Sequence, residues 1–72
     1  MTNPAVARLQ ERIDAVTARI RDALYAVEAS GHPEERVNAA RTEICRSMRL
    51  LLAGAIYVAE EHITTAESLL AE

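Results

Sequence analysis

The sequence predicts an all-α fold, in which two antiparallel helices form a hairpin and two such hairpins assemble into a four-helix bundle. Apolar residues recur along the chain at alternating spacings of three and four, which is the period of a helix face. One turn segment, from Ser30 to Pro33, interrupts this pattern. The stretch from Leu50 to Ala59 carries no charge, and a helix that is apolar nearly all round needs cover on more than one side. A single hairpin cannot supply that cover, so we expect a second chain.

The first helix is predicted over about residues 4–29. Asn3 can accept a hydrogen bond as the N-cap, and Pro4 suits the first helical position. Ser30 and Gly31 end the helix, with Gly31 expected in the left-handed conformation. The apolar residues of this helix form a coiled-coil-like stripe that runs through Val6, Leu9, Ile13, Val16, Ile20, Ala23 and Val27.

The second helix is predicted over about residues 34–71, after a turn at about 30–33. Pro33 can occupy its first helical position, because proline lacks the N–H that has no partner there. Glu34 and Glu35 then lie near the positive end of the helix dipole, where negative charge is stabilising. The short turn makes the two helices antiparallel neighbours.

No further helix breaker is expected in the second helix before about residue 71. Gly54 is unfavourable inside a helix by about 1 kcal/mol relative to alanine. Among its small neighbours it either permits close approach of another helix or is merely tolerated. The alternatives to one continuous helix are a bend near residues 60–64 and a short third helix after Glu61 at the C-terminus.

Two apolar stripes run side by side along the second helix, as in a helix that touches two neighbours. The first stripe, expected to face the first helix, is Val37, Arg41, Ile44, Met48, Leu51, Ala55, Val58, His62, Thr65 and Leu69. The second stripe is Cys45, Leu52, Ile56, Ala59, Ile63, Ala66 and Leu70. The first helix is too short to cover both stripes. We therefore expect a partner interface formed by Leu52, Ile56, Tyr57, Ile63, Leu69 and Leu70.

The size of the chain favours association for a second reason. Its 72 residues make a single helical-hairpin domain over 1–72, and chains of this size are usually marginal alone. One cysteine, Cys45, excludes an internal disulfide, and no Cys and His cluster predicts a structural metal. We therefore expect a protein partner, with a dimer of the chain itself as the first choice.

Composition excludes several other classes of protein. The net charge of −3 argues against a dedicated nucleic-acid binder. The uncharged stretch is about half of the roughly 20 residues that a membrane span needs, and the N-terminal sequence lacks the pattern of a signal peptide. A single thiol fits a reducing compartment, so we expect a cytoplasmic protein. No phosphate-binding loop or nucleophile motif is present, so no cofactor or small-molecule substrate is predicted.

An enzyme would have to use His62 or Cys45. A carboxylate-bridged metal helix needs a glutamate three residues before the histidine, and Ala59 occupies that position. Cys45 has arginines nearby that could stabilise a thiolate, but no histidine lies one helical turn away to act as a base. We interpret Cys45 as a small buried apolar residue, His62 as a residue at the edge of the core, and His32 as an exposed turn residue. No catalytic or metal-binding residue is predicted, and a metal-dependent or thiol-dependent enzyme is the alternative.

Two segments together resemble a known family. The turn Gly31-His32-Pro33-Glu34-Glu35, and Ile56-Tyr57 with His62, are similar to the turn and the apolar-aromatic end of small helical-hairpin co-chaperones of type III secretion needle proteins. The resemblance covers roughly residues 8–62. The chain departs from the family at Arg36, where a tyrosine is usual, and it continues ten residues beyond His62. The resemblance implies a helical hairpin that binds a second chaperone subunit, so that the pair masks an aggregation-prone needle subunit.

These observations predict a non-enzymatic protein–protein interaction module. The first interpretation is a small oligomeric chaperone or adaptor, including a secretion co-chaperone. The alternative is a small helical inhibitor or regulator of a host or toxin protein. Both interpretations need an exposed apolar surface on the folded chain.

Overall fold

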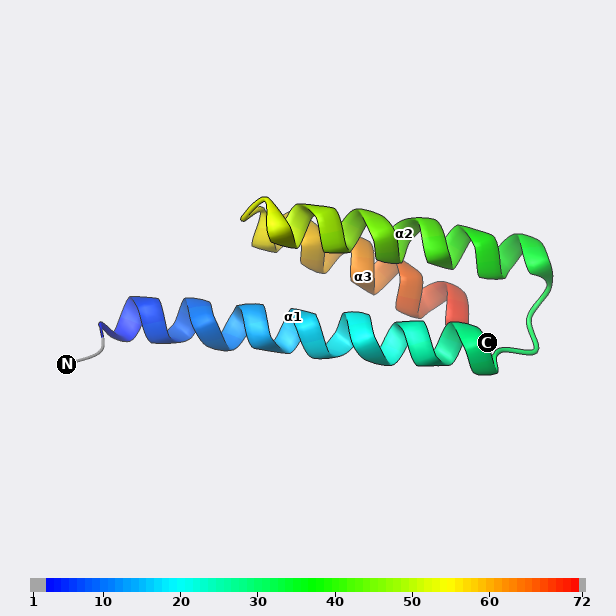
Figure 1. Cartoon of the computed structure of the whole chain (residues 1–72), viewed down its shortest axis with the longest axis horizontal. Helices are drawn as coiled ribbons and strands as arrows, with labels where there is room; N and C mark the ends of the chain where they lie inside the picture. The colour runs from blue at the N-terminus through cyan, green and yellow to red at the C-terminus, as the bar shows by residue number, and fades with distance from the viewer. Residues whose placement is uncertain (1–2, 72) are drawn as a thin grey trace.

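The structure, a computed structural model, describes residues 3–71 as three helices and no strand. They are α1 (Pro4–Ala29), α2 (Glu34–Leu52) and α3 (Ile56–Leu70). α2 runs back along α1, and α3 runs back along α2, so that α1 and α3 point the same way (Figure 1). The molecule is elongated, with extents of 49 × 18 × 15 Å. The predicted all-α class is confirmed.

The sequence at both ends of α1 explains where the helix begins and ends. The Asn3 side chain accepts a hydrogen bond from the Ala5 N–H at 2.8 Å, and Pro4 follows it at the first helical position. At the other end, the Ser30 N–H donates to the Val27 carbonyl at 3.3 Å. Gly31 does not adopt the left-handed conformation that we expected, because Ser30 turns the chain away in an extended conformation.

The expected single helix over about 34–71 is wrong: it is two helices, separated at residues 53–55. Gly54 has a φ of 84°, the only positive value among the described residues. The Gly54 N–H donates to the Leu51 carbonyl at 3.1 Å, and the Ala55 N–H donates to the Leu50 carbonyl at 2.8 Å. These two bonds form a Schellman motif, in which a left-handed glycine satisfies the last carbonyls of a helix. Gly54 therefore ends α2.

The reversal at Gly54 also corrects the expected position of the third helix. The bend is not near 60–64, and α3 begins at Ile56 instead of after Glu61, so it is 15 residues long. Reversal at this point lays the apolar stripe of α3 against the rest of the chain. Burial of that stripe compensates for interrupting the helix, because each large apolar side chain that is buried contributes about 1.5–3 kcal/mol.

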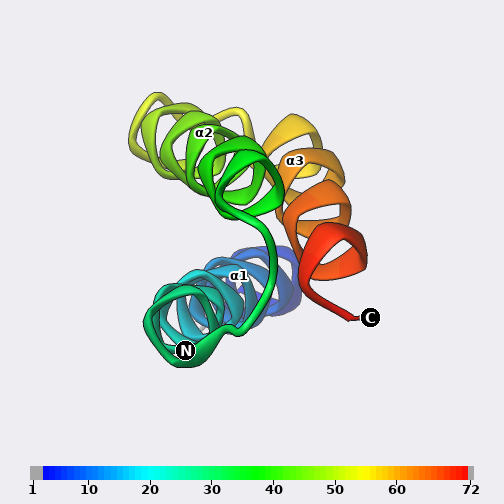
Figure 2. The same ribbon diagram turned by 90° about the vertical axis from the view of Figure 1, so that its right-hand side faces the viewer.

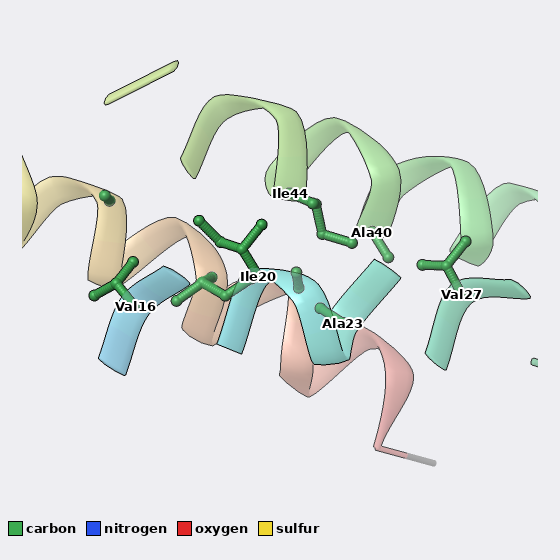
Figure 3. Packing of buried hydrophobic residues seen from close by; sticks show 9 residues of the cluster. Val16, Ile20, Ala23, Val27, Ala40 and Ile44 are labelled. Atoms are coloured by element: carbon green, nitrogen blue, oxygen red, sulfur yellow. The ribbon is translucent and has the colours of Figure 1, made fainter. Parts of the chain in front are cut away.

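All three helices contribute to one core, and α3 lies beside both α1 and α2 (Figure 2). Alanines lie among the branched side chains of this core, which lets the helices approach closely while the branched side chains fill the space between them. Figure 3 shows the side chains of α1 and α2 pointing toward one another. The core residues are Val16, Ile20, Ala23, Val27, Ala40, Ile44, Ala59, Ile63 and Ala66.

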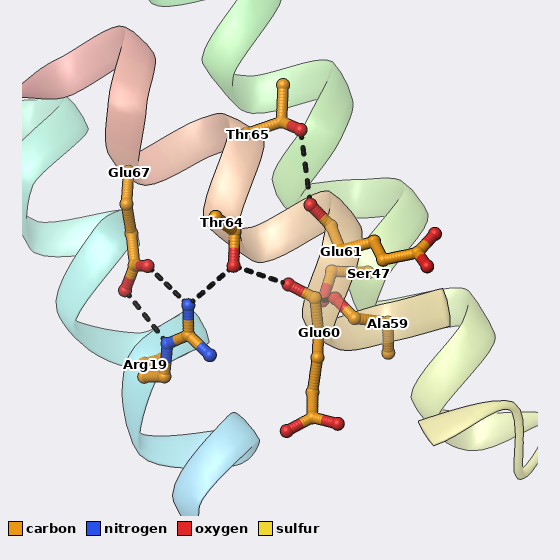
Figure 4. Close-up of polar contacts among 8 residues, drawn as sticks. All are labelled: Arg19, Ser47, Ala59, Glu60, Glu61, Thr64, Thr65 and Glu67. Carbon is orange, nitrogen blue, oxygen red and sulfur yellow. Dashed lines mark hydrogen bonds and ion pairs between the residues drawn. The ribbon is translucent and has the colours of Figure 1, made fainter. Parts of the chain in front are cut away.

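One polar side chain lies fully inside this core. Ser47 of α2 is buried, and its hydroxyl donates to the Ala59 carbonyl of α3 at 2.7 Å (Figure 4). Such a bond satisfies a group that would otherwise cost about 1–3 kcal/mol to bury. This hydrogen bond also fixes the position of α3 along the axis of α2. No buried side-chain nitrogen or oxygen within residues 3–71 lacks a hydrogen-bond partner.

None of the helices described here is long and apolar enough to cross a membrane.

Candidate functional site

Two arginines of α1 hold α3 in register. The Arg12 Nε donates to Glu60 at 3.0 Å, and the Arg19 Nε donates to Glu67 at 3.0 Å. A second nitrogen of Arg19 contacts the other oxygen of Glu67 and donates to the Thr64 hydroxyl at 2.9 Å (Figure 4). The two arginines are seven residues apart, and so are the two glutamates. Carboxylates at this spacing on one helix therefore match arginines at the same spacing on its neighbour.

These ion pairs contribute more to specificity than to stability. The Arg12 side chain is 45% exposed and that of Glu67 is 42% exposed, and exposed pairs contribute at most about 1 kcal/mol each. Hydrogen bonding to Glu67 nevertheless raises the pKa of Arg19 above its usual value. The pairs act mainly by fixing which residues of α3 face α1.

Two residues of the expected partner interface lie inside the chain itself. Ile63 has no exposed surface, and Ile56 is buried as well. The physical reason is the reversal at Gly54, which turns this part of the second stripe toward α1 and α2. It corrects the expectation that these two residues wait for a second chain. Leu69 and Leu70 are half-buried and pack against the edge of the core.

The other two residues of the expected interface are exposed. Leu52, the last residue of α2, is 88% exposed, and Tyr57 is 65% exposed. The Tyr57 ring lies under the guanidinium of Arg12, whose carbon is 4.3 Å from the ring centre. This cation–π contact attaches the start of α3 to α1. Beside it, a shallow hollow of about 320 Å³ is lined by Ala5, Arg8, Leu9, Arg12 and Tyr57.

Sequence reasoning did not predict that the first residues of the apolar stripe of α1 are exposed to solvent. Val6 is 57% exposed and Leu9 is 45% exposed, although both were expected to face the second helix. Figure 1 shows the first turns of α1 extending past the turn that joins α2 and α3. The missing signal was length: α1 has 26 residues and α2 has only 19, so α2 ends before it reaches them.

Cys45 is exposed on α2, which corrects our interpretation of it as a buried residue. It lies in a shallow hollow of about 350 Å³ that is lined by Arg41, Thr42, Cys45, Arg46 and Arg49. Within residues 3–71, no group of three or more His, Cys, Asp and Glu side chains is placed to hold a metal ion.

Both histidines make contacts between elements. The Nδ1 of His62 contacts a carboxylate oxygen of Glu43, which joins α3 to α2. His32 is half-buried instead of exposed, because its Nε2 lies 3.1 Å from the Leu70 carbonyl and ties the turn to the end of α3. The His62 contact lowers the pKa of the Glu43 carboxyl below its ordinary value of 4.5.

The Glu43–His62 contact predicts a dependence of stability on pH. Because the folded state lowers the pKa of Glu43, the Glu43 carboxylate contributes stability that is present above about pH 4.5 and is lost as the pH falls through the folded pKa. We expect a carbon-detected NMR titration to give a higher Glu43 pKa in His62→Gln than in the wild-type chain. The control is Thr65→Ala, one turn away on α3, which should leave the Glu43 titration unchanged. Equal Glu43 pKa values in His62→Gln and wild type would contradict this account.

Comparisons with protein-family models, with curated proteins and with solved structures gave no match to this chain.

Proposed function

We propose that this chain is a non-enzymatic protein–protein interaction module, a small chaperone or adaptor that pairs with a second copy of itself. The observation that supports the proposal is the exposed start of α1, where Val6 and Leu9 continue the apolar stripe of the core into solvent. Leu9 and Val6 lie at helical spacing on the same face as the buried Val16 and Ile20. An apolar stripe that is buried along one half of a helix and exposed to solvent along the other half favours a protein partner that covers the exposed half.

Pairing through these first turns of α1 extends the core. Two copies that lay the open ends of α1 against each other would cover Val6 and Leu9 from both chains, forming an isologous interface. This interface differs from the one expected from sequence, because Ile56 and Ile63 of α3 are already buried against α1 and α2. The resemblance to secretion co-chaperones fits this proposal, since in that family a helical chain works together with a second subunit.

Leu9→Glu tests the proposal. We expect sedimentation equilibrium to show a dimer for the wild-type chain and a monomer for Leu9→Glu, because the carboxylate would be buried without a partner at the interface. Leu9 is already half-exposed in the single chain, so the melting temperature at low protein concentration should change little. The matched control is Gln10→Glu, which adds the same charge at the neighbouring exposed position and should remain dimeric. A wild-type chain that is monomeric at every concentration would contradict self-pairing.

A further inference from the structure

The outer face of α2 carries exposed apolar residues that none of the helices within residues 3–71 covers. Cys45, Met48 and Leu52 recur at spacings of three and four, so they share one side of the helix. All three are exposed, with Met48 at 40% and Leu52 at 88%. The core-facing side of α2 is marked by Ala40 and Ile44. We call the exposed set, Cys45, Met48 and Leu52, the α2 outer stripe.

Two arginines lie along the α2 outer stripe. Arg41 is one turn before Cys45, and Arg49 is one turn after it. They are eight residues apart, which is about 12 Å along a helix. Within residues 3–71, no carboxylate makes an ion pair with either one, whereas the neighbouring Arg46 pairs with Glu43 at 3.0 Å. The two positive charges are therefore left unneutralised beside an apolar surface.

The packing of α1 with α3 shows what such an arrangement recognises. There, Arg12 and Arg19 flank an apolar stripe and pair with Glu60 and Glu67 of the neighbouring helix. The glutamates are seven residues apart, and they flank the apolar stripe of α3 that includes the buried Ile63. Arginines about two turns apart beside apolar residues thus bind a helix that has carboxylates about two turns apart beside its own.

We propose that the α2 outer stripe binds an amphipathic α-helix of a partner protein, which carries two carboxylates seven or eight residues apart beside its apolar face. The carboxylates pair with Arg41 and Arg49, and the apolar face packs on Met48 and Leu52. This inference rests on the proposed role of the chain as an interaction module. It uses a different surface from the start of α1, so one chain pairs with its copy through α1 and receives the acidic helix on α2.

A selection from helical peptides tests this inference directly. The probe is a library of helical peptides with a fixed leucine stripe, whose flanking positions are randomised among Glu, Lys and Gln. Selection for binding to the full wild-type chain should enrich Glu at two positions seven or eight residues apart. With the Arg41→Glu/Arg49→Glu variant, the enriched residue should change to Lys, and the selected Glu peptide should bind at least about tenfold more weakly, which is about 1.4 kcal/mol. Arg21→Glu reverses one charge at an exposed site on α1, as either single variant Arg41→Glu or Arg49→Glu does on α2; it is the matched control for those single variants and should bind like wild type.

Several outcomes would overturn the inference. Selection without charge preference, or a Glu preference that survives in Arg41→Glu/Arg49→Glu, would show that these arginines do not recognise a helix. Dissociation of the dimer by the selected peptide would show that a second copy occupies the α2 outer stripe. Binding of a short DNA duplex that displaces the peptide and depends on the same arginines would indicate a general polyanion site.

The same experiments separate this inference from the proposed self-pairing. A dimeric chain that selects no acidic peptide contradicts only the binding of an acidic helix. A monomeric chain that selects acidic peptides contradicts only pairing through α1. Met48→Ser should weaken peptide binding severalfold and leave the sedimentation of the dimer unchanged, because Met48 is exposed on α2 and outside the start of α1.

Discussion

Ile63→Ala is expected to lower the free energy of unfolding by about 2–5 kcal/mol, the usual cost of truncating a fully buried isoleucine. Ile63 has no exposed surface and packs among residues from all three helices. The substitution removes apolar contacts and leaves a cavity between helices that cannot close fully. Small domains are stable by only a few kcal/mol, so a large part of the population should be unfolded at room temperature. Urea unfolding followed by circular dichroism measures the change.

The matched control for Ile63→Ala is Leu52→Ala. Both residues belong to the second stripe that the sequence analysis assigned to a partner, but Leu52 is 88% exposed. Its truncation should change the free energy of unfolding by no more than about 0.5 kcal/mol. Equal losses in the two variants would indicate that they lie on one continuous surface, and would contradict the burial of α3 within its own chain.

Gly54→Ala is expected to favour a continuous α2–α3 helix over the reversed one by about 2 kcal/mol. About 1 kcal/mol comes from placing a side chain at a φ of 84°, where L-residues are strained. About 1 kcal/mol comes from the higher helix propensity of alanine, which favours the straight conformation. A chain that opens at this point exposes the apolar stripe of α3. We therefore expect a larger fraction of dimer in which α3 packs on the partner copy.

Gly31→Ala is the control for Gly54→Ala. Gly31 has no positive φ, and a Cβ built there meets no atom within 4 Å. Its substitution should leave both the melting temperature and the sedimentation profile close to those of the wild type. If Gly54→Ala behaves like Gly31→Ala in thermal melts and in sedimentation, the left-handed turn does not decide the direction of α3.

Local signals in the sequence predicted the start of α1 but not the end of α2. Asn3 and Pro4 act within one turn of the helix, so their effect is visible without any tertiary structure. Gly54 differs, because a helix-interior glycine costs only about 1 kcal/mol and long helices tolerate it. The chain reverses at Gly54 because Ile56 and Ile63 are then buried against α1 and α2. The free energy gained by this burial depends on contacts between residues far apart in sequence.

The dependence on contacts between distant residues also explains which interface residues could be predicted. The periodicity of the second stripe identified Leu52 and Ile63 as one apolar face, which is correct for a continuous helix. The reversal at Gly54 divides that face, so that Ile63 turns into the core while Leu52 stays in solvent. The exposure of Val6 and Leu9 follows from the short α2, and it could not be predicted before the end of α2 was known.

The reversal of α3 is tested most directly by the distance between two labels, one at each end of the α2–α3 unit. Spin labels on Glu35→Cys and Ser68→Cys, in a Cys45→Ser background and diluted with an excess of unlabelled Cys45→Ser chain, report the distance within one chain by pulsed electron paramagnetic resonance. A continuous helix would hold these positions about 50 Å apart. The structure brings the two ends together, because the His32 ring lies 3.1 Å from the Leu70 carbonyl. We predict a single distribution at less than half of the continuous-helix distance. A distribution near the continuous-helix distance would contradict the reversal and the three-helix core that depends on it.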